Sequence, residues 1–251
     1  MSGMNPAEFA NIAQCERDFW WYRGMRAILF RLLDPYLSGR EISRVLEAGC
    51  GTGFLSLLLE KERRWPVTAV DISGEGLRHA RAMGVREPVQ ADVRHLPFGC
   101  GAFDLALSMD VLVHLPRGGE CEAAREMARV LRPGGLVAVR AAALDLFRSR
   151  HSEFVSERQR FTRRRLCETF TAAGIRVARC TYANALLSPA ALAKFRLWEP
   201  LLRPPVSSGV APLAPWMDRL LHAPLAWEAA WIGAGRNFPA GQSLFLIGEK
   251  S

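Results

Sequence analysis

Lysine is nearly missing from this sequence. Lys61, Lys194 and Lys250 are its only three lysines, although lysine and arginine together number 33 in 251 residues. No apolar run approaches the roughly 18 to 20 residues that a membrane-spanning helix needs. Residues 1–10 lack the basic-then-apolar order of a secretory signal, so we expect a cytoplasmic protein. Internal repeats and low-complexity tails are also missing, which argues against a solenoid or array.

The cysteines form no pair or cluster of the kind that holds a metal ion. They lie far apart, with no CxxC pair and no alternation with histidine, at Cys15, Cys50, Cys100, Cys121, Cys167 and Cys180. We therefore expect reduced thiols and no metal site. Cys50 stands inside a glycine loop, where we interpret it as a small residue in a tight turn in preference to a reactive thiol.

The positive charge is spread along the whole chain. The formal net charge of +8 raises the question of a nucleic-acid or anionic-membrane partner. The densest arginine run, residues 158–165, falls at a predicted helix start, and we interpret it as a solvated face. Nucleic-acid binding is therefore not favoured.

The hydrophobic pattern is that of one α/β domain, which a chain of this length can build around a single core. A helical N-terminal region, Asn5–Leu37, precedes it, and its pattern breaks at Asp34-Pro35. From Arg44 onward short apolar runs alternate with helical segments, which predicts a parallel sheet covered by helices on both faces. The expected strands are Val45–Ala48, Val67–Val70, Pro88–Ala91, Phe103–Met109 and Leu136–Val139, and the expected helices are Phe54–Glu62, Gly74–Ala82 and Glu120–Val130.

The regular alternation of strand and helix patterns ends after Arg140. A helix at Thr162–Ala173 and strands at Ile175–Tyr182 and Ser243–Gly248 are expected. Residues 183–241, rich in Leu, Ala, Pro and Trp, predict broken helices. This insertion is either a lid or substrate pocket, or a packing appendage over a sheet edge. The expected organisation is an N-terminal cap (1–43), a core (44–182), the insertion (183–241) and a final core strand (242–251).

A glycine loop follows the first strand in the segment VLEAGCGTG, Val45–Gly53. The strand ends in an acidic residue, Glu47, and the loop opens a helix. Glycines are needed where the backbone turns sharply and a ligand lies directly against it. Two further acids, Asp71 and Asp92, directly follow the next two strands. Because the carboxyl ends of parallel strands meet at one edge of a sheet, we expect the three acids to converge on a ligand.

The acids also indicate which nucleotide is bound. Asp71 is placed to accept hydrogen bonds from ribose hydroxyls. A dinucleotide-binding loop reads GxGxxG and faces a pyrophosphate, whereas this loop reads acid-x-Gly-x-Gly-x-Gly. The carboxylate of Glu47 would repel a pyrophosphate but suits a sulfonium and an ammonium group. The pattern therefore favours S-adenosylmethionine over a nicotinamide or flavin dinucleotide.

These motifs resemble the class I S-adenosylmethionine-dependent methyltransferases, in the broad group that includes ubiquinone-biosynthesis-type enzymes. The resemblance covers roughly Arg44 to Val139 and is carried by Glu47–Gly53, Asp71, Ala91–Phe98, Phe103–Leu115 and Ala128–Gly135. A softer likeness at Phe19–Arg26 and His151–Leu166 is to a subgroup of bacterial methyltransferases. The resemblance implies a Rossmann-like fold with a mostly parallel seven-stranded sheet and an antiparallel last strand.

The resemblance also implies a role for each matching residue. Glu47, Ala48, Gly49, Gly51 and Gly53 would hold the methionine part and Asp71 the ribose; Asp92, Val93 and Ile72 would contact the adenine; and Met109 would receive the methionine amine on its carbonyl. Tyr22, Arg23 or Arg26 would close the site from the N-terminal helix, unless these arginines are only solvated.

Candidate catalytic residues follow the fourth and fifth strands. Methyl transfer is an in-line attack on an activated sulfonium, so a general base is needed only when the acceptor must lose a proton. His114 and His151 are the candidates, each with a structural role as the alternative, and Asp110 is expected to position its loop. Two departures from the subgroup put acceptor-side chemistry in doubt: Val113 stands where related chains often carry an acid, and Ser152–Arg160 lacks a second histidine.

Three functional classes remain open. A small-molecule methyltransferase is favoured by the cofactor motif and by an insertion whose tryptophans could wall a hydrophobic acceptor, Trp198, Trp216, Trp227 and Trp231. The alternatives are a nucleic-acid methyltransferase, which lacks support from an appended binding module, and a non-catalytic cofactor-binding scaffold. Leu213–Ile232 also leaves open a peripheral membrane contact or a lipid-like acceptor, with core packing as its alternative. The acceptor, the methylated atom and the oligomeric state are not predicted.

Overall fold

The computed structural model describes residues 4–251, so residues 1–3 of the expected N-terminal cap lie outside the described residues. Its centre is a seven-stranded sheet in the order β3-β2-β1-β4-β5-β7-β6. The strands are β1 (Val45–Ala48), β2 (Val67–Asp71), β3 (Val89–Gln90), β4 (Phe103–Met109), β5 (Leu131–Ala142), β6 (Ile175–Ala183) and β7 (Ser243–Lys250). Strands β1 to β5 pair in parallel, and β7 runs antiparallel to both β5 and β6. The predicted sheet with an antiparallel last strand is confirmed.

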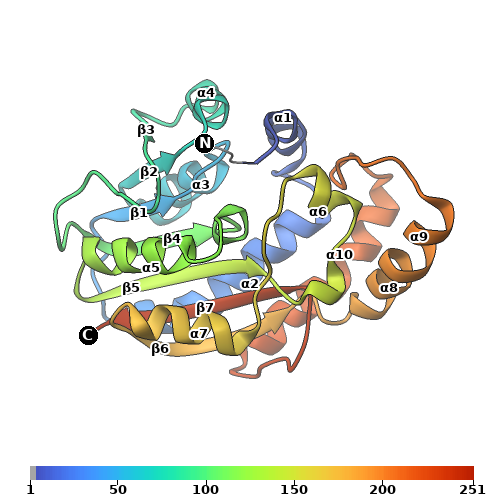
Figure 1. Cartoon of the computed structure of the whole chain (residues 1–251). Helices are drawn as coiled ribbons and strands as arrows, with labels where there is room; N and C mark the ends of the chain where they lie inside the picture. Colours follow the sequence, from blue (N-terminus) through green and yellow to red (C-terminus); the bar gives the residue numbers. More distant parts are fainter. Residues whose placement is uncertain (1–3) are drawn as a thin grey trace.

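Helices cover both faces of the sheet, as predicted (Figure 1). In front in this view lie α5 (Gly119–Val130) and α7 (Arg163–Ala172), whose buried side chains share one core cluster with alternate strand residues. Behind lie α2 (Trp20–Leu37) and α10 (Pro215–Gly233), which share the opposite cluster with α3 (Phe54–Arg63). A smaller cluster holds α4 (Gly74–Met83) against β2. The alternation of strand side chains between faces sorts them into these clusters.

The predicted helical N-terminal region, Asn5–Leu37, forms two helices. Helix α1 (Pro6–Cys15) is separated from α2, and α2 continues through Pro35 to Leu37. The expectation that Asp34-Pro35 ends the helix was wrong. Leu32 and Leu33 are fully buried immediately before it, and a proline in the last turn removes only one backbone hydrogen bond that this packing offsets.

The insertion divides into an outer and an inner part. The outer part is a continuous run of α8 (Ser188–Ala193), the π-helical turn η3 (Lys194–Trp198) and α9 (Glu199–Leu202). The inner part is α10, which runs unbroken through Pro224, so the expectation of broken helices is wrong for this segment. Its face carrying Leu225 and Ile232 is buried against α2, and this packing outweighs the roughly 3 kcal/mol that an interior proline costs. Core packing is thus the role of the C-terminal half of α10.

Short helical turns follow β4 and β5 and approach the insertion. They are η1 (Leu112–His114), η2 (Asp145–Phe147) and α6 (Arg150–Phe154). In Figure 1, α1, α6 and the insertion gather on the right, beyond the carboxyl ends of the parallel strands. Within residues 4–251, no helix is both long and apolar enough to cross a membrane.

Candidate active site

A large cavity lies along the carboxyl ends of the parallel strands, between the core, α1 and the insertion. Its volume is about 1250 Å³, whereas pockets for a single small ligand hold about 300–1,000 Å³. It therefore has room for two ligands. Of the predicted site residues, those that line it are Tyr22, Arg26, Glu47, Gly49, Gly51, Asp71, Ile72, Asp92, Val93, Met109, His114 and His151. Ala48 and Gly53 do not line it.

The glycines of the loop have different structural tasks. Gly49 has a φ of 91°, and a Cβ there would lie 2.0 Å from a Val111 methyl group. Gly53, with a φ of 83°, is the N-cap of α3, and a Cβ there would lie 2.6 Å from Val85. Both positions thus demand glycine. Gly53 allows α3 to pack closely and does not face the cavity, so its predicted contact with the cofactor would be indirect.

Two predicted acids meet at the loop, as expected. Glu47 is buried, accepts a hydrogen bond from Ser56 Oγ, and has its pKa raised by burial to about 8. Asp71 accepts the backbone N–H groups of Gly51 and Ser73, both at 2.8 Å, and burial raises its pKa as well. Carboxylates without a nearby cation in an apolar cavity are costly to ionise. This site is therefore prepared for a positively charged ligand.

A third carboxylate, Glu16, was not predicted from the sequence. It follows α1, and both of its oxygens lie 2.6 Å from Thr52 Oγ1 in the glycine loop. Burial raises its pKa to about 7, against the opposing effects of Thr52 and Arg26. No local pattern marks Glu16, because its partner is 36 residues away and only tertiary structure brings them together.

Asp92 lies at the same edge of the sheet, but its carboxylate already accepts hydrogen bonds from a neighbouring arginine. Its carboxylate accepts the Arg94 guanidinium at 2.6 Å and the Arg94 backbone N–H at 2.9 Å. The hydrogen bond from the Arg94 side chain lowers its pKa. An adenine amino group at Asp92, as the resemblance implies, would share this carboxylate with Arg94. Ile72 and Val93 line the cavity beside it.

The two α2 arginines that were predicted to close the site, Arg23 and Arg26, are held by protein groups. Arg26 donates to the backbone carbonyls of Glu16 and Arg17 and lies 4.8 Å from the Phe54 ring centroid. Arg23 forms a 2.6 Å ion pair with Asp218 of α10. Both therefore fix helices around the cavity. The predicted neutralisation of a cofactor carboxylate would require Arg26 to give up part of this bonding.

An ion pair at the ends of two neighbouring strands lines the cavity. Arg140, at the end of β5, pairs with Asp110 at the end of β4 and stacks 4.2 Å from the Trp21 ring centroid. Asp110 adopts a φ of 60°, an unusual backbone conformation for a residue other than glycine, and its expected role in positioning the loop stays a prediction. Sequence reasoning missed Arg140, which looked like one arginine among many.

The two candidate histidines differ in whether their Nδ1 atom has a hydrogen-bond partner. His114 Nδ1 is buried and has no hydrogen-bond partner among the described residues. Burial lowers its pKa, although a hydrogen bond with the Ser156 backbone opposes this. His151 Nδ1 accepts the Gly209 N–H at 3.0 Å, which leaves the proton on Nε2 in the neutral ring. Burial lowers the pKa of His151 too.

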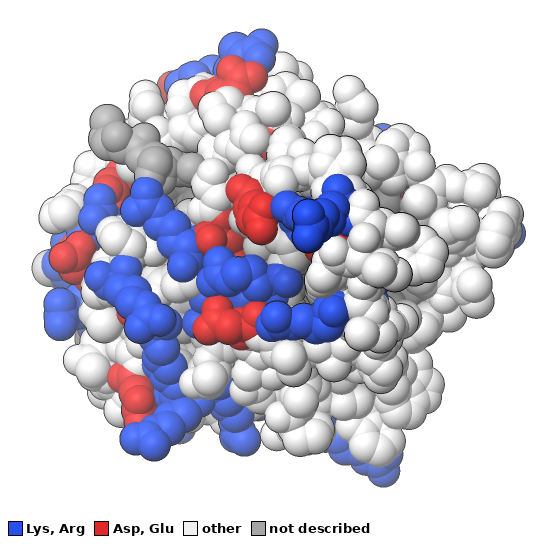
Figure 2. Space-filling model, turned by 45° about the vertical axis from the view of Figure 1, so that its right-hand side comes forward, with Lys and Arg blue, Asp and Glu red and all other residues white. Residues whose placement is uncertain are grey.

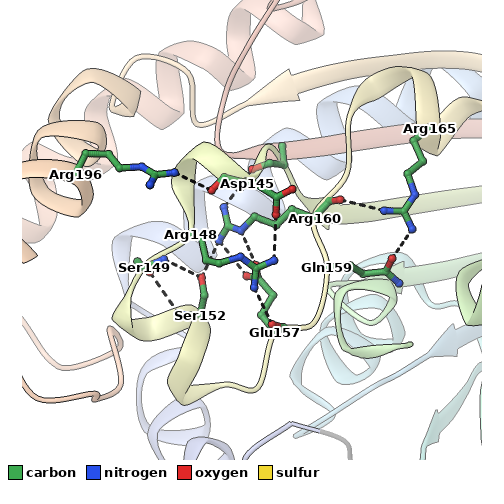
Figure 3. A network of polar contacts seen from close by, with 10 residues as sticks. Asp145, Arg148, Ser149, Ser152, Glu157, Gln159, Arg160, Arg165 and Arg196 are labelled. Carbon is green, nitrogen blue, oxygen red and sulfur yellow. Dashed lines mark hydrogen bonds and ion pairs between the residues drawn. The ribbon is translucent and has the colours of Figure 1, made fainter. Parts of the chain in front are cut away.

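Two members of the arginine run of residues 158–165, Arg158 and Arg160, line the cavity. Arg160 forms a 2.5 Å ion pair with Glu157 and donates to Ser152 Oγ at 3.0 Å (Figure 3). The Arg160 side chain is only 9% exposed, so interpreting this run as a solvated face was wrong for Arg160. Arg165 binds Glu120 of α5. Because Arg160 and Arg165 are paired with carboxylates, the run has less unpaired positive charge to bind nucleic-acid phosphates than its sequence suggests.

Thiols and metal ligands contribute little to the cavity. The six cysteines are free, and Cys50 is buried with a pKa raised by that burial. Across residues 4–251, no group of three His, Cys, Asp or Glu side chains is arranged to hold a metal ion.

The fold and this acid-lined edge define a nucleoside-binding domain of the class I methyltransferase type. Residues 33–139 match the sequence model of the family described as "Methyltransferase domain". The chain is 36% identical over 110 residues to malonyl-[acyl-carrier protein] O-methyltransferase of Enterobacter lignolyticus, covering 43% of each chain. It is 37% identical over 161 residues to ubiquinone biosynthesis O-methyltransferase of Caulobacter sp. (strain K31), covering 54% of this chain and 62% of that relative. The matches thus span less than two thirds of these relatives.

The fold agrees with a solved structure of the same type. Phosphoethanolamine N-methyltransferase 2 of Haemonchus contortus, in complex with S-adenosyl-L-methionine, has a TM-score of 0.60 at 19% identity, covering 98% of this chain and 57% of that one. Residues 33–139 belong to the class I S-adenosylmethionine-dependent methyltransferase family, as the sequence motifs predicted. The cofactor of this family is S-adenosyl-L-methionine. Its sulfonium and ammonium groups fit an edge where burial makes the carboxylates Glu16, Glu47 and Asp71 costly to ionise.

Proposed function

We propose that this chain transfers the methyl group of S-adenosyl-L-methionine to a small, partly apolar acceptor, at oxygen or nitrogen. The observation that carries the proposal is the division of one cavity into two unlike halves. One half holds the glycine loop and the carboxylates Glu16, Glu47 and Asp71, and the other is walled by apolar side chains of the insertion, among them Leu187, Phe195, Trp198, Leu213 and Met217. A cationic nucleoside suits the first half and an apolar acceptor the second.

The predicted contacts divide between these ligands. Glu47 would face the ammonium group, Asp71 the ribose hydroxyls, and Asp92, Val93 and Ile72 the adenine. The bound cofactor supplies an activated methyl group, so the chain must mainly orient the acceptor and exclude water. Two of the sequence relatives are named as O-methyltransferases, and the solved structure of phosphoethanolamine N-methyltransferase 2 is a complex with S-adenosyl-L-methionine, which supports this assignment.

Proton transfer from the acceptor is assigned to His114. The hydrogen bond with the Ser156 backbone favours the protonated ring, so the imidazole is its donor. This leaves the Nδ1 lone pair, which is buried and has no partner among the described residues, as the basic site. A lowered pKa keeps the ring neutral at pH 7, as a base requires. His151 Nδ1 is already bonded to Gly209, so His151 would donate through Nε2 and orient the acceptor.

Two measurements test the proposal in sequence. Isothermal titration with S-adenosylmethionine and S-adenosylhomocysteine should show binding that Asp71→Ala abolishes. Hydrophobic hydroxylated and amine acceptors would then be screened by mass spectrometry for methylated product. Folded wild-type protein that binds neither nucleoside would refute the proposal, whereas binding without turnover on any acceptor would favour the scaffold.

A matched pair of variants tests the base. His114→Asn should lower kcat by 100-fold or more for an acceptor that must lose a proton, with little change in S-adenosylhomocysteine affinity. His151→Asn should mainly raise the KM for the acceptor. Equal effects of the two variants on kcat would contradict the assignment.

A further inference from the structure

Large apolar side chains that face solvent are concentrated in the insertion. Of the ten that are strongly exposed among the described residues, nine lie within residues 183–241. Isolated exposed leucines are ordinary, but such a concentration marks an interaction site. The nine are Leu186, Leu197, Trp198, Leu201, Leu202, Val206, Trp216, Leu220 and Trp227.

Four of these side chains form a stripe on one helical run. Leu197, Trp198, Leu201 and Leu202 are 70%, 62%, 80% and 56% exposed. Trp198, Leu201 and Leu202 follow Leu197 by one, four and five positions, which places all four side chains on one side of η3 and α9. We call these four the outer stripe. Glu199 is the only buried residue of the run from Ser188 to Leu202, so the run offers its apolar side to solvent and not to the core.

The exposed charges of the insertion itself have one sign. The three acids of the insertion are all engaged: Glu199 accepts the Arg150 N–H, Glu228 accepts the Leu186 N–H, and Asp218 pairs with Arg23. The exposed charged residues of the insertion are all basic, namely Lys194, Arg196, Arg203, Arg219 and Arg236. Figure 2 turns this side of the molecule forward, and its right-hand part is mostly white, unlike the crowded charges to the left.

The outer stripe also borders the mouth of the cavity. Lys194, Phe195 and Trp198 line the cavity from the same helical run, and Trp198 is at once a lining residue and strongly exposed. On α10, Met217 lines the cavity while its neighbour Trp216 is 64% exposed. If another surface covered the outer stripe, an apolar molecule could therefore pass from that surface into the cavity without being exposed to water.

We infer that the outer stripe binds the surface of a lipid bilayer that contains anionic lipids. Leucine and tryptophan side chains would enter the boundary between headgroups and acyl chains, and the basic side chains would meet lipid phosphates. Exposed apolar groups accompanied by the exposed basic side chains of the insertion complement such a surface, whereas a second copy of this chain would bring the same positive charge. Bilayer binding does not require methyl transfer. Delivery of a lipid-like acceptor from the bilayer would rest on the proposed function.

Vesicle flotation tests the surface with a charge-matched control. The double variant Leu201→Glu/Leu202→Glu lowers the net charge by two, and neither residue lines the cavity. Arg164→Glu on α7 makes the same change at an exposed site outside the insertion. Wild-type protein and Arg164→Glu should float with phosphatidylcholine vesicles containing phosphatidylglycerol, less so at high salt. The double variant should bind at least about tenfold more weakly, since two leucines lose their burial.

The outcomes separate this inference from the proposed function. Wild-type protein that binds S-adenosylhomocysteine but does not float would overturn the bilayer inference alone. So would a double variant that floats as well as Arg164→Glu does. Light scattering on the same samples adds a third contrary outcome, a wild-type dimer that the double variant dissociates without any vesicle binding. Retained nucleoside binding in the double variant shows that it is folded.

Discussion

At the scale of single residues, the cavity is dominated by acids whose surroundings do not favour their charge. Glu16, Glu47 and Asp71 all have raised pKa values because they are buried. Glu16 and Asp71 accept hydrogen bonds from the glycine loop, and Glu47 accepts one from Ser56 in α3. A cation arriving at this edge would relieve the cost of ionising them, which links ligand binding to both pH and stability.

A single substitution at Asp71 tests the nucleoside site directly. In Asp71→Asn, an amide NH2 must replace one of two oxygens that each accept a backbone N–H, so a donor would face a donor. We expect the Kd for S-adenosylhomocysteine to rise about tenfold or more, as loss of a charged hydrogen bond implies. Titration calorimetry measures this. The control is Asp34→Asn, at an exposed ion pair with Arg63, and an equal change in both variants would contradict the role.

Glu47 predicts how the stability of the free protein depends on pH. Its pKa is about 8 in the folded state against an ordinary value of 4.5, so between these values the folded state holds more protons than the unfolded state. The free energy of unfolding should therefore fall as the pH rises from about 4.5 to 8. Urea denaturation at pH 5.5, 7 and 8.5 would show a smaller decline in Glu47→Gln than in wild type. Glu62→Gln, at an exposed position, should behave like wild type.

At the scale of elements, α1 is the part most directly placed over the nucleoside half of the cavity. Its residues Glu8, Phe9 and Ile12 line the cavity. Glu8 accepts a hydrogen bond from Ser208 of the insertion at 3.0 Å. Glu16, just after the helix, bonds to Thr52. Helix α1 therefore touches both the cofactor loop and the acceptor wall.

Phe9 anchors this helix. Its ring is 2% exposed and lies so close to Gly76 that a Cβ there would approach it to 2.8 Å. In Phe9→Ala, lost packing should loosen α1 and speed S-adenosylhomocysteine dissociation about tenfold or more. Stopped-flow dissociation and hydrogen exchange of residues 6–15 would measure both effects. Ala10→Ser, at an exposed position of the same helix, is the control, and faster exchange without faster dissociation would show that α1 does not retain the nucleoside.

At the scale of the whole molecule, local sequence patterns predicted the strands and most helices, but they did not predict side-chain contacts between residues far apart in the sequence. Buried parallel strands are continuous apolar runs between helices, so the sheet and the acids at its edge could be predicted. The contacts of Glu16 with Thr52 and of Arg140 with Asp110 join residues 36 and 30 positions apart, and no local pattern marks them. Pro35 and Pro224 misled the prediction because burial of neighbouring side chains decided those helices.

Nucleoside binding should stabilise the whole fold. Ligand at 100 times its Kd adds about 2.7 kcal/mol to the free energy of unfolding when only the folded state binds it. Urea denaturation with S-adenosylhomocysteine would measure the gain, and at the same concentration Asp71→Asn should gain less. An unchanged midpoint in wild type, despite binding seen by calorimetry, would indicate that the unfolded chain binds equally well.

The insertion leaves and rejoins the sheet at neighbouring points, since Ala183 at the end of β6 pairs with Ser243 at the start of β7. Chain added or removed between two such adjacent ends does not alter the register of the strands. Evolution can therefore lengthen, exchange or reshape the acceptor wall while the nucleoside edge stays under separate selection. On this scaffold, a change of substrate does not require a new cofactor site.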